Sequence, residues 1–236
     1  MEAEKDIFGL AIKDYLSGER GNVIKVDTNL TEDEELPVDY LFRTKEELPE
    51  WEKMALFLCK GKILDVGAGA GCHSKILQKD GFDVTPIDIA PLTVHGMLSQ
   101  GIDNARVQNY FSVEEKYDTL LFLMNGIGLA KTTEGLNLVF DKAKQILNAG
   151  GQILLESSDI LYMYEEEDGS VVIDLNDRYY GEMTYELSYK GIVSEAFNWL
   201  YVDYNILKDK AEQAGFNVEL LHQGEEGNYL AKLTYR

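Results

Sequence analysis

Cysteine and histidine are scarce in this chain of 236 residues. The two cysteines, Cys59 and Cys72, fall in two different predicted helices, so they form no disulfide framework. The three histidines, His73, His95 and His222, lack the spacing of zinc ligands, and we expect no metal site. No apolar run approaches the length that spans a membrane. These absences predict a soluble, reduced protein that is cytoplasmic and has no membrane partner.

Positively charged residues are also in short supply. Lysine and arginine total 22 against 42 aspartates and glutamates, which gives a net charge of −20. Nucleic-acid binding draws much of its affinity from neutralising phosphates with lysine and arginine, so we expect no nucleic-acid partner. Solubility accounts for the negative charge. Hydrophobic residues make up 45% of the chain, enough for the core of a single domain that spans residues 1–236.

Segment 62–71 carries the clearest local pattern and reads Lys-Ile-Leu-Asp-Val-Gly-Ala-Gly-Ala-Gly. Its first half is apolar enough for a buried parallel strand. The next residues, 72–80, lack glycine and proline and end at Gly81, which predicts a helix. A strand, a glycine turn and a helix in this order bring backbone close to a ligand. The amides and the positive end of the helix dipole are directed at the bound group.

Two acids flank the glycine turn. Asp65 lies two residues before Gly67, and Asp88 ends the next predicted strand, 82–88, at 88 − 67 = 21 positions after Gly67. That interval is typical of an acid that meets ribose hydroxyls. The dinucleotide fingerprint needs a glycine where Cys72 stands, and NAD has no ammonium for Asp65 to hold. S-adenosylmethionine (SAM) has both an ammonium and a sulfonium, and the segment resembles the cofactor site of the class I SAM-dependent methyltransferases.

The resemblance covers residues 50–156 by motif and 203–236 by topology. It implies an enzyme with SAM as its cofactor. The residues expected to bind SAM are Asp65, Gly67, Ala68, Gly69, Gly71, Asp88, Ile89, Gln108, Asn109, Tyr110, Met124 and Asn125. Asn109 could bond the amino edge of the adenine and Tyr110 could pack on its ring, or Tyr110 is an ordinary core aromatic.

The predicted strands alternate with helices, which indicates a parallel sheet wound in right-handed units. The strands are expected at 62–66, 82–88, 105–108, 118–124, 152–156, 216–221 and 228–234. With the resemblance, the fold class is α/β: a Rossmann-like, doubly wound, seven-stranded and mostly parallel sheet with an antiparallel last strand. The chain then divides into an N-terminal helical lid (1–60), a SAM-binding core (61–156), a β-hairpin substrate cap (157–202), and a closing helix with terminal strands (203–236).

Ligands of open α/β sheets lie over the carboxyl ends of the strands, which selects the candidate catalytic residues. Asn125 follows the fourth strand, and Glu156 ends the fifth. Some members of the resembled family that methylate nitrogen have the motif Asn/Asp-Pro-Pro-aromatic at this position. Here no prolines follow Asn125, so we expect no methylation of the amino groups of bases. The alternative roles are a tight turn for Asn125 and a cap or loop residue for Glu156.

His73 falls in the first turn of the helix after the glycines. The helix dipole favours its neutral imidazole there, which could act as a base or as a hydrogen-bond donor. A packed or solvent-facing histidine is the alternative.

Tyrosines gather in the second half of the chain, where a period of two over 179–190, a turn at Lys190–Gly191 and a partner strand over 192–202 predict a hairpin. This hairpin could roof a substrate pocket, form a homodimer interface or simply pack as a sheet. Arg43 could pair an acidic substrate group, or a nearby carboxylate. The candidate substrate residues are Tyr40, Arg43, Asp159, Tyr162 and Tyr201.

Three functions remain open. We favour an enzyme that methylates a small molecule. A protein methyltransferase would need an open groove, and a non-catalytic SAM-binding or scaffold protein would use the same fold.

Overall fold

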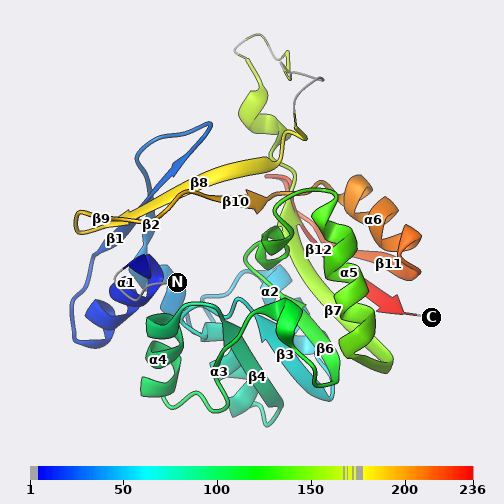
Figure 1. The fold of residues 1–236 in the computed structure, drawn as a ribbon, viewed down its shortest axis with the longest axis horizontal. Coiled ribbons are helices and arrows are strands. Elements are labelled where there is room, and N and C mark those ends of the chain that lie inside the picture. The colour runs from blue at the N-terminus through cyan, green and yellow to red at the C-terminus, as the bar shows by residue number, and fades with distance from the viewer. Residues whose placement is uncertain (1–4, 167, 169, 172, 174–177, 236) are drawn as a thin grey trace.

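A seven-stranded sheet forms the centre of the molecule (Figure 1). The structure is a computed structural model that describes residues 5–166, 168, 170–171, 173 and 178–235. The strand order is β11-β12-β7-β6-β3-β4-β5. The strands are β3 (Lys62–Val66), β4 (Asp83–Asp88), β5 (Arg106–Val107), β6 (Tyr117–Phe122), β7 (Leu147–Ser158), β11 (Phe216–Gln223) and β12 (Asn228–Tyr235).

The adjacent strands β5, β4, β3, β6 and β7 pair in parallel. Strand β12 pairs antiparallel with both β7 and β11. This confirms the mostly parallel, seven-stranded sheet with an antiparallel last strand. No helix in the described part of the chain is long and apolar enough to cross a membrane.

Helices cover both faces of the central sheet, because successive residues of its strands point to opposite sides. Leu64 packs in the core cluster that contains the apolar side chains of α5 and α6, whereas Ile63 packs with those of α2 and α3. The helices are α2 (Glu50–Leu58), α3 (Cys72–Lys79), α4 (Pro91–Ser99), α5 (Gly135–Ile146) and α6 (Tyr204–Gln213).

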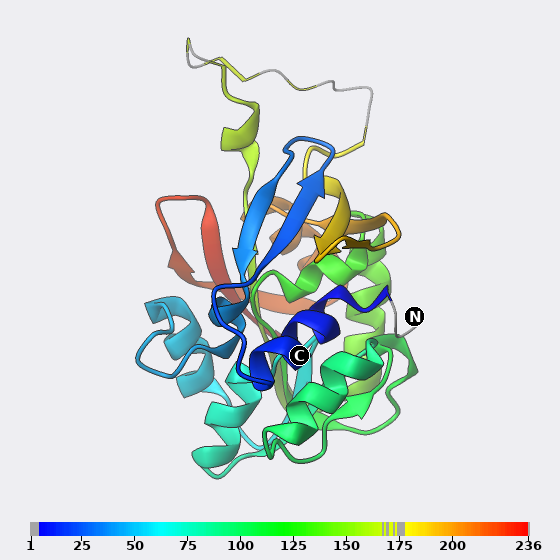
Figure 2. The same ribbon diagram turned by 90° about the vertical axis from the view of Figure 1, so that its left-hand side faces the viewer.

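A second, antiparallel sheet of five strands lies beside the first, with β1 and β2 in blue next to β8 in yellow (Figures 1 and 2). The turn at Lys190–Gly191 joins β8 to β9, and β10 pairs with the rest of β8. The strands are β1 (Val23–Thr28), β2 (Glu34–Pro37), β8 (Glu182–Tyr189), β9 (Ile192–Val193) and β10 (Phe197–Leu200).

The N-terminal segment 1–60 contains the helices α1 (Ile7–Leu16) and α2, but it also contributes two strands, β1 and β2, that were not expected. Strand β1 pairs with β2 on one side and with β8 on the other. The N-terminal segment and the predicted hairpin therefore form one antiparallel sheet. The pairing Val26↔Leu187 joins residues far apart in the sequence. The acidic stretch 28–35 therefore contains the turn and the start of β2, which pairs with the preceding strand β1, and β1 pairs in turn with the distant β8.

Helix α1 (Ile7–Leu16) packs against α4, and the carboxylate of Asp6 fixes the contact. Oδ1 of Asp6 accepts from Gly9 N at 2.7 Å, and Oδ2 accepts from Leu92 N at 2.9 Å and from Thr93 N at 3.2 Å. One buried carboxylate thus caps the amino ends of two helices, where the positive ends of both dipoles meet. Glycine is required at Gly9, since a Cβ there would collide with Leu92.

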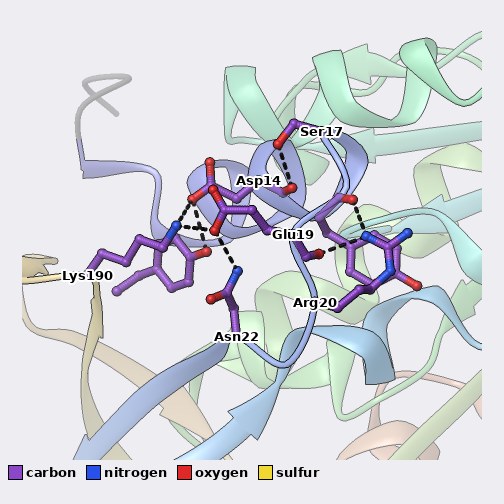
Figure 3. Close-up of polar contacts among 8 residues, drawn as sticks. Asp14, Ser17, Glu19, Arg20, Asn22 and Lys190 are labelled. Carbon is purple, nitrogen blue, oxygen red and sulfur yellow. Dashed lines mark hydrogen bonds and ion pairs between the residues drawn. The ribbon is translucent and has the colours of Figure 1, made fainter.

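Charged side chains join the end of α1 to the turn between β8 and β9 (Figure 3). Lys190 Nζ lies 2.6 Å from Asp14 Oδ2 and also contacts Glu19. The hydroxyl of Tyr189 donates to the same Asp14 oxygen at 3.0 Å. The hydrogen bond from Lys190 is the main cause that lowers the pKa of both carboxyls. Because the charged groups Lys190, Asp14 and Glu19 are all partly exposed, their ion pairs set position more than stability.

We expect Asp6→Ala to lower the free energy of unfolding by about 2–3 kcal/mol, because two helix caps are lost and buried amides are left without acceptors. Urea unfolding measures the change. The matched control is Asp14→Ala, which removes a partly exposed carboxylate of the same helix and should cost clearly less. Equal losses in the two variants would contradict the role given to Asp6.

Candidate active site

The glycine turn between β3 and α3 is held against β4 by its backbone. The N–H groups of Gly67 and Ala68 both donate to the carbonyl of Ile87 at 3.0 Å. Gly67 and Gly69 have φ values of 70° and 55°, and a Cβ added to either would meet no atom within 4 Å. Backbone at these two positions therefore faces open space that a ligand can approach. Gly71 differs, since a Cβ there would lie 2.5 Å from the side chain of Ile102.

Asp88 connects the glycine turn to the start of α4. Its Oδ2 accepts from Gly69 N at 3.2 Å, and its Oδ1 accepts from Ala90 N at 2.9 Å. Burial raises the pKa of Asp88 to about 6, so the group is still mostly ionised at neutral pH. Beside it the side chain of Ile89 is 53% exposed and offers apolar surface at the edge of the turn.

Asp65 lies behind the turn rather than at its surface. The carboxylate is buried and accepts a hydrogen bond from Ser74 Oγ of α3 at 2.6 Å. Burial is also the main cause that raises the pKa of Asp65. The carboxylate of Asp65 therefore lies on the buried side of the glycine turn and does not reach its open side.

The residues after β5 fall into two groups. Gln108 N donates to the carbonyl of Asp88 at 2.9 Å, and Asn109 is exposed and caps the short 3₁₀ helix η3 (Tyr110–Ser112) with its side chain. Tyr110 instead lies in the core, and its hydroxyl donates to the carbonyl of Val139 at 3.0 Å. The structure thus places Gln108 and Asn109 at the edge near Asp88. Tyr110 is a core aromatic, which was the alternative interpretation of this residue.

Met124 and Asn125 follow β6 in left-handed conformation, with φ values of 50° and 55°. Neither is a glycine, and two such residues in succession store strain of about 1–3 kcal/mol each. Met124 N donates to Glu156 Oε2 at 2.9 Å. The amide of Asn125 donates to the carbonyl of Leu200 at 3.1 Å and accepts from Ser157 Oγ at 2.7 Å. Asn125 therefore joins β6 to β7 and to the second sheet.

A buried ionic cluster connects α2 and α3 on the other side of Met124. Glu52 lies 3.0 Å from the guanidinium of Arg43 and 2.6 Å from His73 Nε2, and all three are buried. Arg43 also stacks on the ring of Tyr40 at 3.8 Å and approaches the sulfur of Met124 at 3.2 Å. Arg43 thus pairs with a carboxylate of the protein, Glu52, which was the alternative to its pairing with an acidic substrate group.

Glu52 is a member of this cluster that was not predicted from the sequence. The spacing along α2 indicates a buried stripe of Trp51, Met54, Ala55 and Leu58, but the structure buries Glu52 with Ala55 and Leu56, and Met54 is 36% exposed. No local signal separates Glu52 from the other acids of this helix. Its partners come from other segments.

The contact with Glu52 favours the charged form of His73. Burial lowers the pKa of His73, but interactions with Cys72 and Glu52 outweigh it and raise the pKa well above its ordinary value. For Glu52, burial raises the pKa, but His73 and Arg43 reverse the effect and lower it. The ion pair thus overrides the helix dipole, which favours the neutral imidazole.

Glu156 lies in the buried part of β7, and both of its carboxylate oxygens accept hydrogen bonds. Oε1 accepts from Trp51 Nε1 at 3.1 Å, and Oε2 accepts from Met124 N. Burial is the main cause that raises its pKa. A carboxyl with a raised pKa beside the strained turn is suited to accept a proton.

The remaining candidate substrate residues lie on two sides of the site. Tyr40 and Arg43 stack together near Met124. Tyr201 stacks with Tyr185 of β8 at 6.4 Å between ring centroids. Asp159 and Tyr162 line a cavity of ≈ 650 Å³, whose walls are formed by Asp159, Leu161, Tyr162, Glu225, Glu226 and Gly227.

No group of three or more metal-binding side chains is found among the residues that the structure describes.

Comparison with known proteins gives a clear relative among solved structures. A SAM-dependent methyltransferase from Bacteroides fragilis in complex with S-adenosyl-L-homocysteine is 40% identical, with a TM-score of 0.93 over 100% of this chain and 97% of that one. DesVI from Streptomyces venezuelae is 18% identical over 84% and 96% of the two chains, with a TM-score of 0.58. The sugar N-methyltransferase KedS8 from a Streptoalloteichus species is 16% identical over 78% and 85%, with a TM-score of 0.53. No protein-family model and no curated protein matches.

The charged state of His73 predicts a pH-dependent stability. Its raised pKa contributes stability that is fully present below the unfolded value of about 6.5 and is lost as the pH rises through the folded value. The free energy of unfolding should therefore fall above about pH 6.5, by at most about 1.4 kcal/mol per pH unit. Urea unfolding across that range should show the slope in the native protein and in the exposed control His95→Gln, but not in His73→Gln. A slope that persists in His73→Gln would assign it to another group.

Proposed function

The chain belongs to the class I SAM-dependent methyltransferases, and on this premise we propose that it transfers a methyl group to a small-molecule acceptor bound beneath the five-stranded sheet. SAM is the cofactor of this enzyme. When bound, SAM supplies a methyl carbon on a positively charged sulfur, which is already an excellent leaving group. The task of the protein is then mainly to align the acceptor.

The residues around the glycine turn fit this cofactor. Gly67 and Gly69 leave open space against their backbone, and Asp88 presents a mostly ionised carboxylate beside them. In our proposal, Asp88 accepts the ribose hydroxyls, and Ile89 and Asn109 hold the adenine. The buried charge of Asp65 favours the cationic end of SAM through the turn.

The contact between the two sheets carries the proposal of a small acceptor. Asn125 bonds the backbone of Leu200, and Trp199 Nε1 donates to the carbonyl of Asn125 at 3.2 Å. Side chains of the second sheet share one apolar cluster with Ala70 of the glycine turn and with Met124. The end of β6 is therefore covered by folded chain, which favours a small molecule over the open groove that a protein acceptor would need.

Two groups at this covered end are suited to the chemistry. Glu156 lies against Met124 and has a raised pKa, so we assign it as the candidate proton acceptor for a hydroxyl or amino acceptor. Asn125 sets the position of the second sheet and orients the acceptor from the turn. His73, held by Glu52, is assigned a positioning role, because its Nε2 is already bonded.

We expect Asp88→Ala to weaken SAM binding by roughly 10- to 100-fold, through loss of the charged acceptor for the ribose. Calorimetric titration with SAM measures the affinity. The matched control is Asp83→Ala, at the exposed opposite end of the same strand, and it should bind like the native protein. Since Asp88 also bonds backbone, thermal unfolding of both variants must show that they are folded. Unchanged affinity in a folded Asp88→Ala protein would remove Asp88 from the site.

The small-molecule acceptor is tested with SAM that carries an isotopic label on its methyl group. The enzyme is incubated with an extract separated by ultrafiltration into metabolites and proteins. We expect enzyme-dependent label in the metabolites and none in the proteins, with Asp88→Ala as the inactive control. Label in the protein fraction alone would support the protein methyltransferase instead.

A further inference from the structure

One face of the second sheet carries aromatic side chains and a single carboxylate. The inference drawn from this face rests on the proposed function and makes its substrate class more specific. Cross-strand partners share one face of a sheet. The registers place Glu34 opposite Val26, and Val26 opposite Leu187, so these three residues share a face. Tyr185, two residues before Leu187, lies on it too and stands opposite Phe197.

This face is the one that packs toward the site. Val26, Leu187, Tyr185 and Phe197 belong to the apolar cluster that also contains Met124 and Ala70. Among the described strands of the second sheet, Glu34 is the one charged residue on this face. The other charged residues of these strands, such as Glu35 and its partner Lys25, lie on the outer face.

Aromatic rings lie on the same face of the sheet as this carboxylate. Tyr185 stacks with Phe197 at 5.8 Å and with Tyr201 at 6.4 Å between centroids. Burial raises the pKa of Tyr201, and the nearby Tyr162 and Glu34 raise it further, so both side chains lie within electrostatic reach of that hydroxyl. Tyr162 thus marks where the aromatic face meets the cavity of ≈ 650 Å³.

Three carboxylates give the cavity an acidic wall. Asp159, Glu225 and Glu226 line it together with Tyr162. Among the described residues, no lysine or arginine forms an ion pair with these three acids or with Glu34. A cavity lined by these three carboxylates and by the ring of Tyr162 is complementary to an ammonium group.

We propose that the methyl acceptor carries a protonated amino group, which binds between the aromatic face at Tyr185 and Tyr201 and the carboxylates of Glu34 and the adjoining cavity. The positive charge holds the acceptor in place. An anionic acceptor is rejected by the same carboxylates.

The first experiment separates this inference from the proposed function. Ultrafiltered metabolites are divided by cation exchange at neutral pH into retained and unretained fractions, and each is incubated with the enzyme and methyl-labelled SAM. We expect enzyme-dependent label in the retained fraction. Label in the unretained fraction alone would keep the small-molecule function but overturn the amino acceptor. Label in neither fraction would refute the proposed function itself.

The second experiment compares two neighbouring glutamates, with the labelled compound of the retained fraction as substrate. We expect Glu34→Gln to raise the KM for this compound by roughly three- to tenfold with little change in kcat, because one charged contact is lost from binding. Added salt should raise the KM of the native enzyme more than that of Glu34→Gln.

The control is Glu35→Gln, which removes the same charge from the outer face and should leave both constants unchanged. SAM affinity should be native in both variants, which also shows that they are folded. Equal KM values for Glu34→Gln and Glu35→Gln would overturn the inference.

Discussion

The left-handed turn at Met124 and Asn125 is the constraint on which the arrangement of the two sheets depends. This backbone is strained, and the surrounding hydrogen bonds hold it in place. Glu156 fixes Met124 N, and the amide of Asn125 bonds both Ser157 and Leu200. Each such bond contributes about 1 kcal/mol net, so together they offset part of the strain. The outcome is that the end of β6 and the edge of the second sheet have one fixed relative position.

The cluster of Arg43, Glu52 and His73 also fixes the position of Met124, from the side of its sulfur atom. Burying three ionised groups has a large desolvation cost, and apolar side chains would often give a more stable core. The cluster therefore contributes geometry rather than stability. It orients Arg43 against the sulfur of Met124 and ties α2 to the first turn of α3, directly after the glycine turn. Both sides of the strained turn are thus fixed by polar contacts from distant segments.

How much of this follows from the sequence depends on the range of each interaction. The glycine turn, Asp65, Asp88 and the seven strands of the central sheet are predictable, because the strand and helix periods and the turn chemistry are local. The antiparallel last strand came from the family resemblance. The second sheet was predicted only as a hairpin, since the partner of β8 is a strand near the start of the chain. Glu52 had no local signal at all, because its burial depends on Arg43 and His73.

The N-terminal segment connects these constraints to the cofactor site. Asp6 caps α4 at its first turn, and Asp88 caps the same helix just ahead of it through Ala90 N. The charge of Asp6 is close enough to contribute to the raised pKa of Asp88, after the larger effect of burial. Helix α1 also holds the β8–β9 turn through Asp14 and Lys190. Helix α1 therefore contacts both α4, which follows Asp88, and β8 of the second sheet, so its position connects these two elements.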